Sequence, residues 1–516
     1  MPIQETDKVQ NNAASKASHT PSLSTSLDEN LQLFRTIFKS DETLRIRVIE
    51  NSHCRNIRCC LVFVDGMIDQ TLIQEGIIKP VIEFEFEEAD GMNPAELMEK
   101  FRTQIISVNE VMASEKLDEL VGAVVAGKSV FMVDGYAGAL NINTQGWEIR
   151  AITDPMTEKG IRGPREGFTE SLLVNLTQIR RRVQNTDLKF VFSEIGTRSK
   201  TQTCICYMES LASPDILKEL HGRLERVEID HIMDTGHLSE LIRDEPYSPY
   251  EMIGNTERPD SLVAKIMEGR IGVLIEGSPF ALTLPFVFVE NFQSSEDYYI
   301  NYFFSSFNRI LRIIGAFMSI SIPAIYVALV TYSQEMVPTA LLLSIASARL
   351  AVPFPTVVEA FIMLTIFEIL REAGARIPTS IGEAVSIVGA LVLGQAAVDA
   401  RIVSAPMVIV VGLTGITALL NPKLTGSSIV VRICLLVLAF FLGIYGYFFG
   451  LLGLVIHLMS LRSFGVPYML GVGSIRPQDV KDTFIRVPWW HMHTRPALIG
   501  ARNMKRMTQK QPRRKL

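Results

Sequence analysis

The sequence is poor in cysteine and has no overall excess of basic residues. Its six cysteines are too few and too irregularly spaced for a disulfide framework or a zinc ribbon, which excludes a small disulfide-stapled protein. We interpret them as small buried hydrophobic side chains, and we expect neither a metal nor a cofactor. The formal net charge is only −5, so the composition does not predict nucleic-acid binding.

Targeting and catalytic signals are also missing. Residues 1–30 are rich in Ser, Thr, Asn and Gln, and they lack the basic start, apolar run and cleavage site of a signal peptide. We expect a disordered tail there. No hydrolase elbow, HExxH motif or catalytic dyad is found, and His221, His231 and His237 lie near acids in a pattern typical of a solvated helix face. The sequence therefore gives no support for an enzyme.

Charge is scarce over one long stretch. Residues 303–460 hold 14 of the 105 charged residues in 158 positions, whereas the other 358 residues hold 91. Within this stretch the uncharged runs Ile313–Gln334, Ile402–Pro422 and Ile433–Leu461 are each long enough to cross a bilayer. This pattern predicts a membrane protein with a large soluble portion ahead of its first crossing.

The flanking charges predict its orientation. Arg309 and Arg312 precede the first run, and from Thr483 onward there are nine Lys or Arg and no acid, so both ends should face the cytosol and anionic lipid. Both ends inside require an even number of crossings. Three shorter apolar pieces should form re-entrant or protein-enclosed helices, and we expect one of them to complete a fourth crossing. These pieces are Met336–Ala348, Phe354–Phe367 and Ala384–Val398.

Residues 31–300 alternate helix and strand patterns. Apolar spacing predicts helices over Leu31–Lys39 and Asn93–Ile105. Period-two alternation predicts strands over Val81–Phe86, Lys189–Ser193 and Thr203–Met208. Mixed patterns of this kind predict α/β folding for this half of the chain.

The expected fold is two small mixed α/β soluble domains followed by an all-α multi-span membrane domain. Asp, Pro and Gly cluster between Thr153 and Pro164, which marks the boundary between the soluble domains. The expected segments are a disordered tail (1–30), a first α/β domain (31–155), a second α/β domain (156–275), a helical transmembrane domain with short re-entrant or enclosed helices (276–475) and a basic cytosolic tail (476–516).

One motif imitates a nucleotide site. Gly122–Ser129 satisfies the P-loop pattern letter for letter. A working P-loop follows a strand and opens a helix. Here Leu117–Val124 has a helix pattern, and Val130–Val133 has a strand pattern that enters a turn at Asp134-Gly135. We therefore interpret Gly127 as a helix cap and expect no nucleotide.

Several multi-residue motifs occur in one order along the chain. They are Gly163-Pro-Arg-Glu-Gly-Phe-Thr-Glu170, Thr256-Glu-Arg-Pro-Asp260, Glu276-Gly-Ser-Pro279, Glu296-Asp-Tyr-Tyr299, Val352-Pro-Phe-Pro355, Glu368-Ile-Leu-Arg-Glu-Ala-Gly374 and Gly394-Gln-Ala-Ala397. With these motifs the chain resembles the A subunit of the GerA-type spore germination receptors from about residue 150 to Pro496. Gly465-Val-Pro-Tyr468 continues with Met469-Leu470-Gly471, which departs from the alanine or serine and then proline usual in the family.

The resemblance implies a multi-pass protein of the inner membrane of bacterial spores, with both termini in the spore core. It implies a homo-oligomer, a pentamer, that conducts cations when a transporter-like B subunit senses a nutrient germinant, together with a lipoprotein C subunit. Two alternatives stay open: a non-conducting scaffold that couples the sensor to another channel, and a sister branch of the family that serves dipicolinic acid release.

One apolar segment carries polar residues on a single helical face. Val358, Phe361, Thr365, Glu368 and Glu372 share a face of a helix running from about Pro355 to Ala373. Ionisable side chains at membrane depth are costly against lipid, so this face predicts a pore lining with carboxylate rings that favour cations. The alternative is an anchor in which the two glutamates pair with Arg371, Arg376 or Arg349 at the membrane edge.

Three further predictions concern packing and assembly. Small residues at Ser386, Gly389, Ala390 and Gly394 predict close helix packing in the membrane. Pro323 and Pro406 lie in long apolar runs, where proline can kink a helix. Charged residues in turn-rich segments are expected to make contacts between subunits; they are Arg165, Glu166, Glu257, Arg258 and Asp260.

Overall fold

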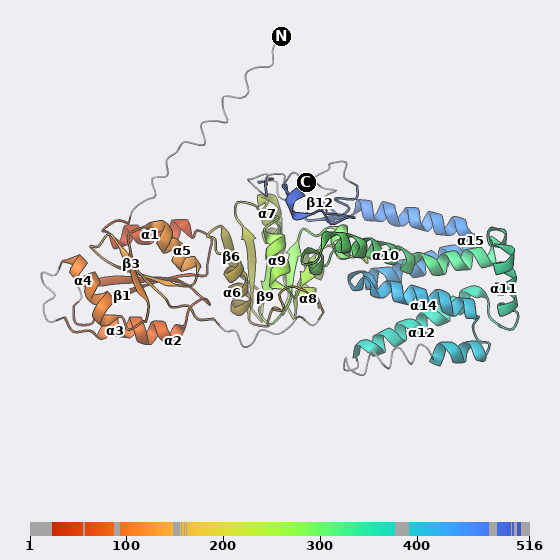
Figure 1. Cartoon of the computed structure of the whole chain (residues 1–516), viewed down its shortest axis with the longest axis horizontal. Helices are drawn as coiled ribbons and strands as arrows, with labels where there is room; N and C mark the ends of the chain where they lie inside the picture. The colour runs from red at the N-terminus through yellow and green to blue at the C-terminus, as the bar shows by residue number, and fades with distance from the viewer. Residues whose placement is uncertain are drawn as a thin grey trace, which may run out of the picture.

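The structure, a computed structural model, describes residues 23–54, 57–86, 93–147, 155, 157–158, 160, 162–376, 392–473, 482–496, 498–499 and 503–506. Its elements form three parts along the longest axis of the molecule: a first sheet with its helices, a second sheet with its helices, and a helical region (Figure 1). The second sheet lies between the other two parts, so it is the part that contacts the helical region.

The first sheet has the strand order β1-β2-β4-β5-β3, and all neighbouring strands are antiparallel. Cys59 and Leu61 face one hydrophobic core and Cys60 and Val62 face another, because successive side chains of a strand point to opposite faces. Burial on both faces explains why the central strands, Arg58–Val64 and Ser129–Val133, are apolar over most of their length. The strands are β1 (Leu44–Glu50), β2 (Arg58–Val64), β3 (Val111–Ser114), β4 (Ser129–Val133) and β5 (Ala139–Ile142).

Helices cover both faces of this sheet. Helices α1 (Leu27–Ile37) and α5 (Leu117–Val125) contribute to one core. The opposite core is closed by α2 (Gln70–Ile73), η1 (Gln74–Ile78), α3 (Lys79–Glu83), α4 (Pro94–Lys100) and η2 (Phe101–Ile105). The helices expected at Leu31–Lys39 and Asn93–Ile105 are confirmed, and the Asn93 side chain accepts a hydrogen bond from the N–H of Ala95 at the start of α4.

The strand expected over Val81–Phe86 is wrong. Residues Lys79–Glu83 form helix α3, which continues the run begun at Gln70. Ile77, Ile78 and Val81 are buried together on one side of this run, so helical burial of three side chains outweighs a short alternating pattern.

The interpretation of the P-loop string is confirmed. Helix α5 ends at Val125, Gly127 has φ +90°, and strand β4 begins at Ser129. The N–H of Lys128 donates to the carbonyl of Ala123 (2.9 Å), so this backbone closes the helix end. The Lys128 side chain pairs with Glu110 at 3.4 Å. The glycine and lysine therefore terminate a helix, which is the reverse of phosphate-binding geometry.

The second sheet repeats the connectivity of the first. Its order is β6-β7-β9-β10-β8, all antiparallel, so in both sheets the third strand of the sequence lies at the edge beside the fifth. The strands expected at Lys189–Ser193 and Thr203–Met208 are confirmed within β6 and β7. The elements are β6 (Leu188–Ile195), β7 (Thr201–Met208), β8 (Gly254–Thr256), β9 (Ile271–Ile275), β10 (Ala281–Leu284), α6 (Leu172–Arg182), α7 (Pro214–Glu225), α8 (Thr235–Ile242) and α9 (Pro259–Ile266).

The segment after the second sheet leads into the helical region. Two short 3-10 helices, η3 (Phe288–Phe292) and η4 (Ser295–Tyr298), precede α10 (Tyr302–Thr331). Beyond α10 come η5 (Gln334–Met336), α11 (Thr339–Arg349), α12 (Thr356–Arg376), a short helix over residues 392–399, α14 (Ala405–Leu419), η6 (Pro422–Leu424) and α15 (Thr425–Ser460). Two helices of the described chain, Tyr302–Thr331 and Pro422–Ser460, are long and apolar enough to cross a membrane.

Helix α15 folds back on itself. At Gly443 the backbone leaves the helical conformation, with φ 61° and ψ −141°. Leu435 and Gly450 lie on opposite sides of this break, yet a Cβ added to Gly450 would be 2.7 Å from the Leu435 side chain. The apolar run Ile433–Leu461, expected to be one crossing, is therefore broken into two arms that lie side by side.

The other long uncharged run also forms a helix that is shorter than the run itself. Within the run Ile402–Pro422, the α-helix extends only from Ala405 to Leu419. Arg401, just before the run, has φ 59°, and the helix begins after Ser404. Pro406 lies in the first turn of α14, where proline is tolerated, so it does not kink a helix. Pro323 does lie inside α10.

The chain after α15 returns to the second sheet. A hairpin of β11 (Arg462–Ser463) and β12 (Val466–Pro467) follows the helix, and a further short helix is η7 (Trp489–His491). Phe464, Val466, Leu470 and Ile499 are buried in the same core as α7 and α8. The C-terminal segment is thus part of the second sheet's core, and both long helices are attached to that sheet at the same end of the helical region (Figure 1).

Candidate functional site

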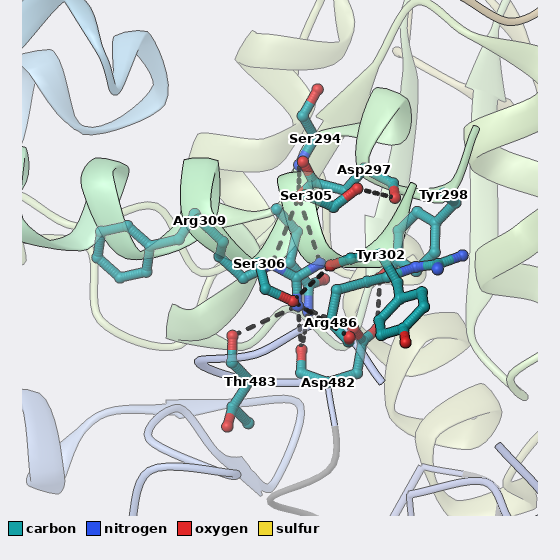
Figure 2. A network of polar contacts seen from close by, with 12 residues as sticks. Ser294, Asp297, Tyr298, Tyr302, Ser305, Ser306, Arg309, Asp482, Thr483 and Arg486 are labelled. Carbon is teal, nitrogen blue, oxygen red and sulfur yellow. Dashed lines mark hydrogen bonds and ion pairs between the residues drawn. The ribbon is translucent and has the colours of Figure 1, made fainter. Parts of the chain in front are cut away.

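A buried polar network connects the start of α10 to the segment before it and to the C-terminal segment (Figure 2). We call it the junction network. Its central members are Asp297, Tyr298, Arg309, Arg312 and Asp482.

Asp297 is the anion at the centre of this network. It lies in η4 and is 1% exposed, and the backbone N–H of Ser294 donates to its carboxylate (3.3 Å). Two arginines of α10 donate to the same carboxylate, Arg309 through Nη2 at 3.3 Å and Arg312 through Nη1 at 3.1 Å. These arginines are three residues apart and so share one helix face. One carboxylate therefore fixes the first turns of α10 against the preceding segment.

Arg309 connects this centre to the C-terminal segment. It is completely buried, and its Nη1 donates to the backbone oxygen of Asp482 (2.7 Å) and to the carboxylate of Asp482 (2.8 Å). The hydroxyl of Tyr298 donates to the other carboxylate oxygen at 2.5 Å. Burial, together with the Asp482 charge, raises the pKa of Tyr298 well above its ordinary value, so the phenol stays protonated as a donor.

A second buried charge cluster lies beside the junction network. Glu290 of η3 is 4% exposed in its side chain and pairs with Arg270 (2.6 Å) and Lys265 (2.8 Å). Burial alone would raise the pKa of Glu290, but the attraction of the two cations lowers it below its ordinary value. Glu268 pairs more loosely, with Arg506 at 3.4 Å, and burial raises its pKa. This cluster connects α9 and β9 of the second sheet to η3 and to the C-terminal segment.

A cavity of about 200 Å³ opens next to this charge cluster. Its lining combines paired charges with aromatic rings, and Lys423 from η6 pairs with Glu158 at its wall (2.9 Å). The principal lining residues are Lys265, Glu268, Arg270, Glu290, Tyr298 and Trp489.

The chemistry of the junction is electrostatic. Removing one partner of a buried ion pair leaves an uncompensated charge and costs several kcal/mol, so such a network fixes relative position strongly. A displacement of the second sheet or of the C-terminal segment therefore moves the start of α10 with it. The arrangement can transmit mechanical change between the second sheet and the helical region.

The five residues expected at subunit contacts lie beside this region, and most are used within the chain. Arg258 is 2% exposed, pairs with Asp260 (2.9 Å) and donates to the carbonyl of Pro164 (2.9 Å). Glu257 is buried and accepts from the N–H of Thr157 (2.9 Å).

The other members are more accessible. Glu166 pairs with Arg182 at 2.5 Å and is half-buried, whereas Arg165 is exposed. Arg165 is thus the exposed member of the set.

The expected pore face lies on α12, and its residues differ in environment. Thr365 and Glu372 are exposed, and Val358 and Phe361 are half-buried. Glu368 is paired on both sides, with Arg371 (2.7 Å) and with Arg432 of α15 (3.0 Å).

Glu372 pairs with Arg376 at 2.7 Å at the end of the helix. Two pairings named in the anchor alternative, Glu368 with Arg371 and Glu372 with Arg376, are therefore formed.

A further carboxylate of α12 is completely buried. Glu359 accepts from the N–H (3.0 Å) and the hydroxyl (2.7 Å) of Ser404, and it lies 3.5 Å from Arg349. It therefore fixes the end of α11 and the start of α14 against α12.

The small residues expected at a helix contact are described only in part. Ser386, Gly389 and Ala390 lie outside the described residues. A Cβ at Gly394 would meet Val408 of α14 at 3.5 Å, so this glycine faces a neighbouring helix.

Sequence reasoning identified Arg309 and Arg312 only as charges flanking a membrane run. It missed Asp297, Glu290 and Asp482, because an acidic residue in a loop carries no local signal of burial. Arg309 and Asp482 are separated by 173 positions, so no spacing rule relates them. The motif Glu296-Asp-Tyr-Tyr299, which contains Asp297 and Tyr298, marked this segment in the sequence but not the partners of its side chains.

The fold and the junction define a class: an α/β protein with two sheets whose second sheet is connected by buried ion pairs to a region of apolar helices. A family model for the Bacillus/Clostridium GerA spore germination protein matches residues 32–498. The chain belongs to this family.

Two similar proteins agree with this assignment. The uncharacterized membrane protein YfkQ of Bacillus subtilis is 39% identical, covering 93% of each chain. Spore germination protein KA of the same organism is 38% identical over 93% of this chain and 87% of that protein. The crystal structure of the N-terminal domain of the A subunit of the Bacillus megaterium spore germinant receptor GerK3 covers 52% of this chain and 99% of that domain, with 24% identity and a TM-score of 0.41. The family, the relative described as a membrane protein and the two apolar helices together indicate a membrane-associated protein of spore germination.

Proposed function

We propose that this protein is the A subunit of a nutrient germinant receptor and forms the oligomeric, cation-conducting part of it. It works in the inner spore membrane with a transporter-like B subunit that senses the germinant and with a lipoprotein C subunit. The observation that carries the proposal is the exposed polar face of α12. Thr365 and Glu372 point away from the chain's own core, and polar side chains among apolar helices need water or another subunit rather than lipid.

The course of the helices supports several crossings. Helix α10 leaves the second sheet, and the two arms of α15 go out and come back to it, ending at Ser460 beside the β11–β12 hairpin. Helices α12 and α14 lie alongside them (Figure 1). A chain that starts and ends its helical region at the same sheet has an even number of crossings, with both termini in the spore core.

The junction network gives the proposal a gating route. Arg309 and Arg312 belong to the first apolar helix, and their partners Asp297 and Asp482 belong to segments packed on the second sheet. A partner that shifts the second sheet therefore shifts α10. We also propose that neighbouring subunits meet through the surface around Arg165.

The test is potassium flux from liposomes that contain the full-length protein, alone and with its B and C partners. We expect germinant-dependent flux that Thr365→Trp reduces and that Glu372→Gln makes less cation-selective. The matched control is Ile409→Trp, because Ile409 is an apolar residue of α14 that is 70% exposed and is not part of the predicted pore face. Flux that neither α12 substitution changes would refute the assignment of the pore to this helix.

The pairing of Glu368 favours one alternative function. Since Glu368 neutralises Arg432 and Arg371, α12 also serves as a structural anchor, as a non-conducting scaffold would require. A complete, germinant-binding complex that passes no ions would establish the scaffold, and the conducting path would then belong to another protein.

A further inference from the structure

The beginning of α10 presents an unusual surface. Phe303, Phe304 and Phe307 are 70%, 57% and 57% exposed, although each is a large apolar side chain. They precede Ile313, where the uncharged run begins. The opposite side of the same turns carries Ser305 and Arg309, which are buried in the junction network. These turns therefore have one face fixed in protein and one apolar face without a partner in the described chain.

The C-terminal segment extends this apolar face. Trp490 contacts Tyr302 with ring centroids 5.7 Å apart, and the hydroxyl of Ser306 donates to the carbonyl of Arg486 (3.3 Å). Trp489 and Trp490 are 40% and 51% exposed. Ring contacts join Trp490 to Tyr302 and Tyr302 to Phe303, and Trp489 packs on Tyr298. Aromatic residues of two segments almost 190 positions apart thus lie close together; the set is Tyr302, Phe303, Phe304, Phe307, Trp489 and Trp490. We call it the aromatic collar.

Basic groups accompany the collar. The Arg486 guanidinium lies over the rings of Tyr298 (5.9 Å) and Trp489 (5.6 Å), and Arg506 lies over Trp489 (5.3 Å). Lys505 is exposed beside them. From Thr483 onward the sequence has nine Lys or Arg and no acid; of the four that the structure describes there, Arg486 is buried, Lys505 is exposed and Arg495 and Arg506 are half-buried.

We propose that the aromatic collar lies in the headgroup layer of the membrane and that the basic C-terminal segment binds anionic lipid there. Tryptophan and tyrosine favour this layer because their rings are apolar at one end and polar at the other. Each nearby basic residue adds electrostatic attraction to an anionic leaflet. An apolar patch of this size in water would otherwise be an aggregation site.

The collar has a mechanical consequence. It couples the C-terminal segment to the bilayer at the level where α10 enters, while Asp482 of that segment is bound to Arg309. The membrane surface, α10 and the second sheet therefore meet at one point. This inference does not depend on ion conduction by the chain.

The chain offers a clean test, because Trp147, Trp489 and Trp490 are its three tryptophans. Trp147 lies in the first α/β part, packed under Arg181, so Trp147→Phe leaves only the collar to report. The full-length Trp147→Phe protein is reconstituted into vesicles whose lipid chains carry bromine either near the headgroup or near the chain end. Bromine quenches tryptophan only at short range, so its position measures depth.

We expect stronger quenching by bromine near the headgroup than by bromine near the chain end. The matched control, Trp489→Phe with Trp490→Phe and Trp147 retained, should show almost no quenching by either lipid. Absence of quenching in Trp147→Phe would overturn the proposal and mean that water or another protein chain covers the collar. Stronger quenching from the chain end would overturn it as well, since the collar would then lie within the hydrocarbon.

The lipid charge is tested in the same protein. Vesicles of pure phosphatidylcholine are compared with equimolar phosphatidylcholine and phosphatidylglycerol, with brominated chains in both. We expect several-fold less quenching of a Lys505→Glu variant than of its parent in the anionic vesicles and equal quenching in the neutral ones. If the variant and its parent were quenched equally in the anionic vesicles as well as in the neutral ones, the anionic-lipid contact would be refuted. Circular dichroism of each variant verifies that its helices are intact.

Discussion

The sharpest test of the junction network is Asp297→Asn. The substitution keeps the shape of the side chain but removes the negative charge from a site that is 1% exposed. Arg309 and Arg312 would then face an uncharged amide, whose NH2 group cannot accept their hydrogen bonds. Arg309 keeps Asp482 as a partner, whereas Arg312 loses its carboxylate.

The expected magnitude follows from this geometry. Removing one partner of a buried ion pair costs about 3–5 kcal/mol, and the remaining Asp482 places this variant near the lower figure. For a cooperative unit of about 150–250 residues, a loss of about 3 kcal/mol lowers the unfolding midpoint by on the order of 6–12 °C. The matched control is Glu99→Gln, because the Glu99–Arg102 pair is exposed, at 56% and 41%. An exposed pair is screened by water and contributes little to stability.

The assay is thermal unfolding of the full-length protein in detergent, followed by fluorescence in the Trp147→Phe background. Trp489 lies 5.9 Å from the Tyr298 ring, so its emission reports the junction itself. Equal midpoints for Asp297→Asn and Glu99→Gln would refute the reasoning, because the buried network would then contribute no more than a surface pair. A partial rescue by the added change Arg312→Met would show that the unpaired cation causes the loss.

Three further predictions concern other charges. Burial raises the pKa of Glu268 in the folded state above its ordinary 4.5, so the folded state binds the proton more tightly than the unfolded state does. The wild-type protein should therefore lose stability relative to Glu268→Gln as the pH rises above about 4.5. A pH series of unfolding midpoints in which wild type gains stability relative to Glu268→Gln would contradict this. Asp41→Asn should cost about 3–5 kcal/mol, because its partner Arg180 is 1% exposed, and faster proteolysis between the two sheets would report it. A fluorescent ATP analogue should bind the wild-type protein and Lys128→Ala only at background level. Specific binding to the wild type that is lost in Lys128→Ala would contradict the helix-cap interpretation.

Local patterns predicted those parts of the fold that depend on neighbouring residues. The helix at Asn93 could be predicted because its cap and its apolar spacing lie within one turn. The reversed order of helix and strand around Gly127 was legible for the same reason. The prediction for Val81–Phe86 was wrong because a short alternating run is compatible with either a strand or a helix. Burial of Val81 against the first sheet favours the helix.

The candidate site could be predicted only in outline. The polar face of α12 follows from helical periodicity, but the pairing of Glu368 with Arg432 joins two helices 64 positions apart. The repeated strand order of the two sheets is also invisible in the sequence, since shared topology needs no shared residues. The break at Gly443 could not be predicted, because it lies inside a uniformly apolar run and hydropathy does not indicate where such a run turns back.

By itself the sequence determined that the chain has a charged half and an apolar half, which segments of the apolar half could enter a membrane, and which family the chain belongs to. These follow from composition, run length and motif order, which are properties of adjacent residues. Only the tertiary structure decided that Asp297 and Asp482 converge on Arg309 and that the C-terminal segment joins the second sheet. The physical reason is that a buried charge is stabilised by whichever partners the fold brings within hydrogen-bonding distance, and that distance is independent of separation along the chain.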